Sequence, residues 1–125
     1  MGENQYFDSG YTEDDVNTAT PVRLIVILYD AAARLCEDAR GYIDRKDLSG
    51  LSQAIDKCNA IISELQSSLN LKEGGEIASS LNDLYDYIKA NLRRAGDEQN
   101  KHLIDEVSKL LENLGSAWRH VDACK

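Results

Sequence analysis

Apolar residues recur at alternating spacings of three and four along four long segments of this 125-residue chain. That spacing returns side chains to one face of an α-helix, so each segment predicts an amphipathic helix. A sustained run with a period of two, which a half-buried strand needs, does not occur. The chain is therefore predicted to be all-α. The pattern is clearest between residues 48 and 70, where the apolar face consists of Leu48, Leu51, Ile55, Cys58, Ile62, Leu65 and Leu69.

Capping residues set the expected boundaries of the first two helices. Thr20 and Pro21 predict a helix over residues 21–46. A threonine hydroxyl can accept a bond from a free N–H group at the helix start, and proline has no N–H to leave unpaired. Asp47 is the expected N-cap of a second helix over residues 48–70.

Glycines separate the remaining two helices. The Gly74–Gly75 pair precedes a third helix, expected over residues 76–95, and Gly96 is expected to end it. Asp97 is then the expected N-cap of a fourth helix that runs to about residue 122.

Four helices with short connections predict an antiparallel four-helix bundle over residues 18–125. Residues 1–17 are polar, contain glycine and carry isolated apolar side chains such as Tyr11 and Val16. We therefore expect a mobile N-terminal arm ahead of the bundle.

The charge balance argues against two classes of partner. Fourteen Lys and Arg residues stand against 22 Asp and Glu, for a net charge of −8. A nucleic-acid binder needs a basic face, and anionic membrane surfaces also repel an acidic chain. The longest apolar run spans residues 24–29, far short of the roughly 18 residues that cross a bilayer. We expect neither nucleic-acid binding nor membrane insertion.

The start of the chain and its cysteines predict a cytosolic protein. The first ten residues lack the basic and apolar regions of a secretory signal. The three cysteines are an odd, widely spaced set without the spacing of a zinc site, so we expect reduced thiols.

No catalytic or metal-binding motif stands out. The two histidines, His102 and His120, lie on the fourth expected helix, and neither follows a Glu at the spacing of a di-metal bundle. We expect no cofactor, no metal and no enzymatic activity. A phosphotransfer bundle stays open as an alternative, and phosphorylation of either histidine would support it.

The first helix is more apolar than one face of a bundle needs. Residues 24–29 are apolar all round, and Ile25 and Tyr29 belong to a second apolar stripe. Two interpretations stay open. The surface is either a wide core stripe, partly covered by the arm, or a binding surface for an extended apolar partner such as a helix.

Short motifs in order along residues 11–121 resemble the FliS family of flagellar export chaperones. The chain departs from the family pattern at Ala31, where the family often has glycine, and a methyl group is tolerable in a helix. The matching motifs are Val16-Asn-Thr-Ala-Thr-Pro21, Leu28-Tyr29-Asp30, Ile61-Ile-Ser-Glu-Leu65, Gly74-Gly-Glu-Ile77, Leu84-Tyr-Asp-Tyr-Ile88, Asp105-Glu-Val107, Leu110-Leu111 and Ala117-Trp118.

The resemblance implies a cytoplasmic chaperone without catalytic activity. It implies that the chain binds the C-terminal segment of flagellin, prevents premature polymerisation and keeps the client competent for flagellar type III secretion. The flagellar export apparatus is a further candidate partner. The arm is implied to cover the bundle and to yield to the client. A chaperone for another export substrate stays open as an alternative.

The resemblance also suggests partner-binding residues. The arm would contribute Tyr11 and Val16, with Asn17 at the junction. The first helix would present Ile25 and Tyr29 to the client. Four further positions on the third and fourth helices match the family pattern and are either client-facing or core: Leu84, Tyr85, Leu110 and Trp118.

Overall fold

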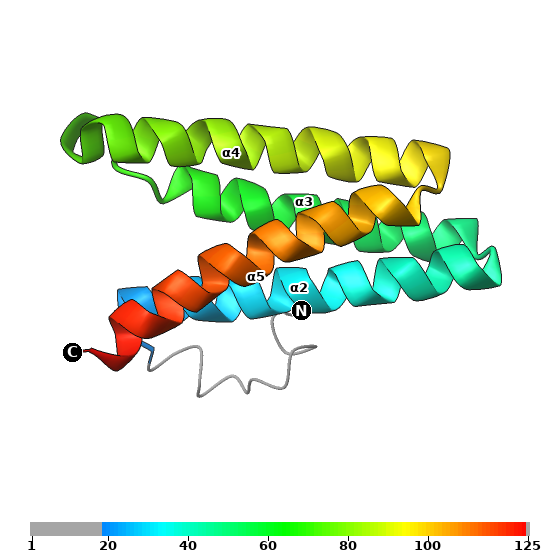
Figure 1. Ribbon diagram of the computed structural model, residues 1–125, viewed down its shortest axis with the longest axis horizontal. Coiled ribbons are helices and arrows are strands. Elements are labelled where there is room, and N and C mark those ends of the chain that lie inside the picture. Colours follow the sequence, from blue (N-terminus) through cyan, green and yellow to red (C-terminus); the bar gives the residue numbers. More distant parts are fainter. Residues whose placement is uncertain (1–18, 125) are drawn as a thin grey trace.

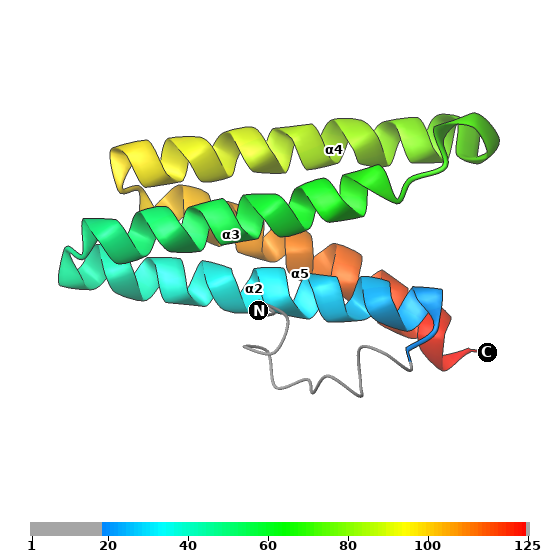
Figure 2. The ribbon, with the colours of Figure 1, turned by 180° about the vertical axis from the view of Figure 1, so that it is seen from behind.

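The computed structural model describes residues 19–124, except for the side chains of residues 71–73. It contains four helices, α2 (Pro21–Arg45), α3 (Leu48–Ser67), α4 (Leu71–Glu98) and α5 (Lys101–Ala123). Successive helices run in opposite directions (Figures 1 and 2). The described residues contain no strand. The prediction of an all-α, antiparallel four-helix bundle is therefore confirmed.

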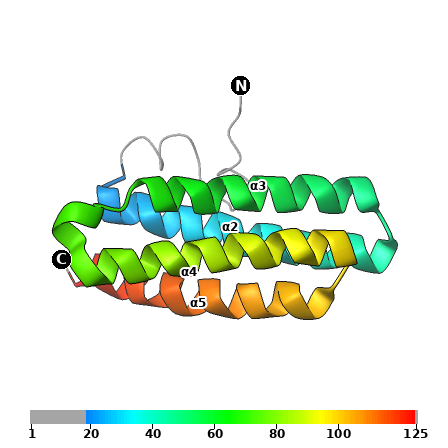
Figure 3. The same ribbon diagram turned by 90° about the horizontal axis from the view of Figure 1, so that it is seen from above.

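The four helices occupy the corners of the bundle, so that α2 lies diagonally opposite α4. The packing contacts are those of α2 with α3 and α5, and of α4 with α3 and α5 (Figure 3). The predicted apolar faces meet between them and form one core. Burial of each large aliphatic side chain stabilises the fold by about 1.5–3 kcal/mol. The largest buried aliphatic side chains are Ile27, Leu51, Ile61, Ile62, Leu65, Ile88, Leu92, Ile104 and Leu111.

The first two helices begin at the predicted N-caps. The Thr20 hydroxyl accepts a hydrogen bond from the Arg23 N–H at 3.1 Å, and Asp47 accepts one from the Gly50 N–H at 2.9 Å. The end of α3 lies at Ser67, three residues before the expected end at residue 70. There the backbone N–H of Ser68 bonds the carbonyls of the last turn and ends the helix.

The predicted break at the paired glycines is present inside α4. Gly75 has φ 55° and ψ −131°, a conformation outside the helical region that glycine adopts without a steric penalty. One helical turn precedes this break, because α4 already begins at Leu71. The third helix is thus a short turn followed by a long regular segment.

The expected boundary between the third and fourth helices was wrong. Helix α4 continues through Gly96 and Asp97 to Glu98, and the left-handed residue after it is Gln99, with φ 53°. Gly96 serves packing instead, since a Cβ there would lie 3.3 Å from Cγ1 of Ile55 on α3.

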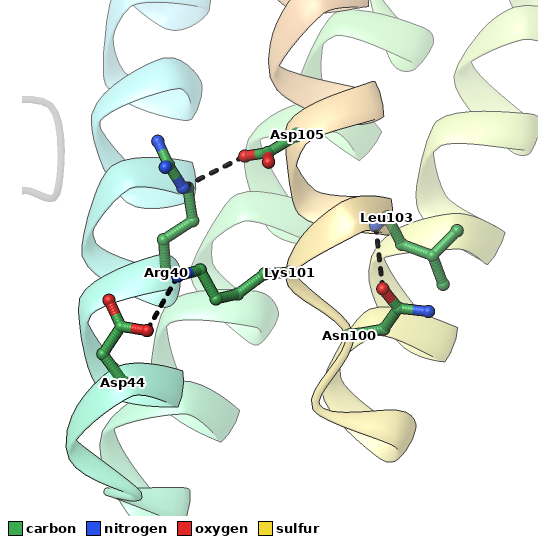
Figure 4. A network of polar contacts seen from close by, with 6 residues as sticks. All are labelled: Arg40, Asp44, Asn100, Lys101, Leu103 and Asp105. Atoms are coloured by element: carbon green, nitrogen blue, oxygen red, sulfur yellow. Dashed lines mark hydrogen bonds and ion pairs between the residues drawn. The ribbon is translucent and has the colours of Figure 1, made fainter.

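The N-cap of α5 is Asn100. Its side-chain oxygen accepts a hydrogen bond from the Leu103 N–H at 3.2 Å (Figure 4). Nearby ion pairs fix α5 against α2, including Arg40–Asp105 at 3.0 Å and Lys101–Asp44 at 2.8 Å (Figure 4). Both ion pairs are largely exposed, and solvent screens the attraction between their charges. They therefore contribute little to the stability of the bundle and act mainly on the register of α5 against α2.

Replacing Asn100 with alanine is expected to destabilise the bundle by about 1 kcal/mol, because the N-terminus of α5 loses its cap. Asp97→Ala is the matched control and should change the free energy of unfolding by less than about 0.5 kcal/mol, since Asp97 is exposed inside α4. Urea denaturation of both variants measures the difference. Equal effects would contradict the assignment of the cap to Asn100.

Candidate functional site

An apolar cleft of about 240 Å³ opens at one end of the bundle. It lies where the α3–α4 connection meets the start of α2 and the end of α5. Figures 1 and 2 show the last turns of α5 running away from the first turns of α4 at this end. The separation leaves part of the inner helix faces accessible. The cleft is lined by Ile25, Leu65, Ser68, Leu69, Asn70, Gly74, Ile77, Ala78, Leu81, Tyr85 and Trp118.

The rim of this cleft carries an exposed apolar side chain. Ile77 is 76% exposed and is the most exposed large apolar residue that the structure describes. Leu24 near the start of α2 and Val121 near the end of α5 are also exposed, at 37% and 47%. Exposed apolar surface beside an apolar cleft is typical of a binding site for another protein.

Two buried tyrosines next to the cleft form a hydrogen bond through their hydroxyl groups. The hydroxyl oxygens of Tyr29 on α2 and Tyr85 on α4 are 2.5 Å apart, and the two residues are 1% and 2% exposed. Because each hydroxyl is the other's partner, neither is left unsatisfied in the core. The pair adds a satisfied polar contact to a mostly apolar interior, which also contains Asn59 and Asn91.

Both tyrosines are held in the neutral form. Burial is the main cause that raises the pKa of Tyr29, the hydrogen bond with Tyr85 raises it further, and a hydrogen bond with Trp118 lowers it. Burial also raises the pKa of Tyr85, against a lowering effect of the bond with Tyr29. At neutral pH the two hydroxyls therefore act as hydrogen-bonding groups and carry no charge.

A second depression, of about 450 Å³, lies between α2 and α5 and has a charged rim. Arg119 on α5 and Asp30 on α2 form an ion pair of 2.6 Å at this rim. Tyr29 and Leu111 contribute the apolar part of its lining. The two depressions therefore share the buried tyrosine pair, since Tyr29 lines one and Tyr85 the other.

The structure separates the expected partner-binding residues into several groups. Ile25, Tyr85 and Trp118 come together in the apolar cleft. Leu84 and Leu110 are half-buried and pack against the core without lining this cleft. The expected arm residues lie outside the described part of the chain: Tyr11, Val16 and Asn17.

Tyr29, which was expected to face the client, is buried in the core of the bundle. Its side chain is 1% exposed, because α3 and α5 both pack against α2 and cover the second apolar stripe. The wide stripe of the first helix is thus mostly core, which favours the first of the two open interpretations, although the arm that was expected to cover part of it lies outside the described residues. Ile25, one turn earlier, is half-buried and reaches the cleft.

Ile77 is the main cleft residue that sequence reasoning missed. Helical spacing places it on one face with Leu81 and Ile88, but sequence reasoning assigns it to no binding site. The available signal was its position two residues after the Gly74–Gly75 break. Neighbouring helices do not fully cover an apolar side chain so close to a helix end, so the side chain stays exposed.

The described residues do not assemble a metal-ligand cluster of three or more His, Cys, Asp or Glu side chains. Both histidines are exposed on α5, where His102 pairs with Glu106 at 3.2 Å and His120 lies 3.6 Å from the Cys124 sulfur. Within residues 19–124, no helix combines the length and the apolar character needed to cross a membrane.

Comparison with known proteins identifies relatives over almost the whole chain. The family model described as "Flagellar protein FliS" matches residues 2–125. A protein from Salmonella typhimurium named "Flagellar secretion chaperone FliS" is 34% identical over 110 residues, which cover 87% of this chain and 82% of the relative. A protein from Pseudomonas aeruginosa named "Flagellar secretion chaperone FliSB" is 36% identical over 85% of this chain and 84% of the relative. The chain therefore belongs to the FliS family.

Proposed function

We propose that this chain is a cytosolic export chaperone for flagellin. It binds the C-terminal segment of flagellin, prevents premature polymerisation and keeps the client competent for flagellar type III secretion, without catalysing a reaction. The observation that carries this proposal is the family match over residues 2–125, together with relatives named flagellar secretion chaperones. The apolar cleft supports it with a suitable surface.

The cleft fits an apolar segment of a client better than a polar ligand. Its lining combines aliphatic side chains from α2, α3 and α4 with the aromatic rings of Tyr85 on α4 and Trp118 on α5. An amphipathic helix can place successive apolar side chains into such a groove. The client segment loses conformational freedom when it binds, so the affinity depends on extensive apolar contact.

Further contacts belong to the same proposal. The half-buried residues Leu84 and Leu110 extend the apolar surface of α4 and α5 beyond the cleft. The N-terminal arm, with Tyr11, Val16 and Asn17, competes with the client for the bundle surface. The flagellar export apparatus is a further partner of the loaded complex.

Co-purification with flagellin tests the proposed function directly. Full-length flagellin is expected to co-purify with the chaperone, whereas flagellin without its C-terminal segment is expected to be lost. Equal recovery of both forms would contradict binding through the C-terminal segment. Recovery of neither form would point to a different export substrate.

A further inference from the structure

The hydroxyl pair of Tyr29 and Tyr85 joins helices that do not otherwise pack against each other as neighbours. Helices α2 and α4 lie at diagonal corners of the bundle. The side-chain contacts described elsewhere in the fold join adjacent helices, as Gln66 on α3 does by donating to Asn82 on α4 at 3.0 Å. The 2.5 Å contact between the two hydroxyls instead crosses the centre of the bundle.

Trp118 brings a third helix to the same point. Its indole lies close enough to the Tyr29 hydroxyl to lower the pKa of Tyr29. Gly115, about one turn earlier on α5, also lies against α2 here, since a Cβ at this position would make an ordinary contact of 3.5 Å with Cβ of Tyr29. Tyr29, Tyr85 and Trp118 thus form an aromatic cluster, with one residue each from α2, α4 and α5.

Two of the three residues of this aromatic cluster form part of the cleft wall. Tyr85 and Trp118 line the cleft, whereas Tyr29 lines only the charged depression between α2 and α5. The position of the Tyr85 ring is therefore fixed by a bond to a residue that does not line the cleft.

We propose that the hydroxyl of Tyr29 positions the aromatic wall of the apolar cleft and thereby increases client affinity without touching the client. This inference rests on the proposed function. Tyr29 is a positioning residue for Tyr85, whose ring lies beside Trp118 in the wall of the cleft. Without the Tyr29 hydroxyl, the Tyr85 ring loses its anchor and the client must order this wall when it binds. Binding to a preorganised wall avoids this entropic cost.

Tyrosine-to-phenylalanine substitutions test the inference because they remove only the hydroxyl. Tyr29→Phe is expected to weaken binding of the flagellin C-terminal peptide about fivefold, the change that corresponds to one typical hydrogen bond. Tyr87→Phe is the matched control on α4, since Tyr87 is 51% exposed and is not among the cleft-lining residues. Calorimetry at a temperature at which all variants are folded measures the affinities.

The double variant Tyr29→Phe/Tyr85→Phe separates positioning from a purely structural role. Its stability should partly recover relative to either single variant, because no hydroxyl is then left without its partner. Its affinity should stay reduced, because the wall is still without its anchor. Affinity that recovers together with stability would overturn the inference.

Trp118 supplies a readout that does not need the client. It is the only tryptophan of the chain, so its fluorescence reports on the cluster alone. Tyr29→Phe is expected to shift the emission of the free protein, and Tyr87→Phe is not. Unchanged emission and unchanged affinity in Tyr29→Phe would overturn the inference while wild-type binding still supports the proposed function. A wild-type protein that fails to bind the peptide would overturn both.

Discussion

Replacing Tyr29 with aspartate is expected to unfold the bundle. The Tyr29 side chain is 1% exposed and its hydroxyl bonds to Tyr85 in the core. An aspartate there would leave a buried charge without a partner, a cavity in place of the ring and an unsatisfied hydroxyl on Tyr85. Together these changes should cost at least about 4 kcal/mol, a large fraction of the stability of a small domain. Circular dichroism at 25 °C should show a loss of most of the helical signal.

Tyr29→Phe is the control for this experiment. It keeps the ring and its packing, so the helical signal should be retained with a cost of only about 1–3 kcal/mol for the unpaired hydroxyl of Tyr85. A Tyr29→Asp protein that melts like the wild type would show that water reaches this position. The outcome matters for interpretation, because the resemblance assigns Tyr29 to client contact, and a charge at an exposed contact residue weakens binding more than folding. The burial of Tyr29 makes the opposite ranking expected.

The helix starts could be predicted where the cap is a local interaction. Thr20 and Asp47 each bond an N–H group three residues later, so the side chain and its partner lie next to each other in the sequence. Gly96 shows where this reasoning fails. A glycine near a helix end favours termination, but here its missing side chain makes room for Ile55 on a different helix. Only the packing of α3 against α4 distinguishes the two roles.

The binding surface could be predicted less well than the fold, for a related reason. Helical spacing shows which residues share a face, as it did for Tyr29 and Ile77, but it does not show which neighbours cover that face. Tyr29 lies in the middle of α2, where α3 and α5 cover it. Ile77 lies near the start of α4, where the helices separate and its side chain stays exposed.

Replacing Ile77 with aspartate is expected to weaken binding of the flagellin C-terminal peptide at least about tenfold, the effect of losing a central apolar contact in an interface. Client binding would bring the new carboxylate close to the apolar lining of the cleft and remove water from it, which is unfavourable. Stability should change by less than about 0.5 kcal/mol, because Ile77 is 76% exposed and an acidic residue is tolerated near the start of a helix. Calorimetry for affinity and urea denaturation for stability measure the two effects separately.

Leu48→Asp is the matched control for Ile77→Asp. Like Ile77, Leu48 is a large exposed apolar residue near the start of a regular helical segment; it is 55% exposed and begins α3 at the opposite end of the bundle. Both substitutions introduce the same charge into a chain of net charge −8, so a general electrostatic effect on the client would appear in both. Weakened binding in Ile77→Asp alone would place the client at the apolar cleft. Equal losses in the two variants would favour a nonspecific charge effect, and unchanged affinity in Ile77→Asp would move the client to a surface outside the apolar cleft.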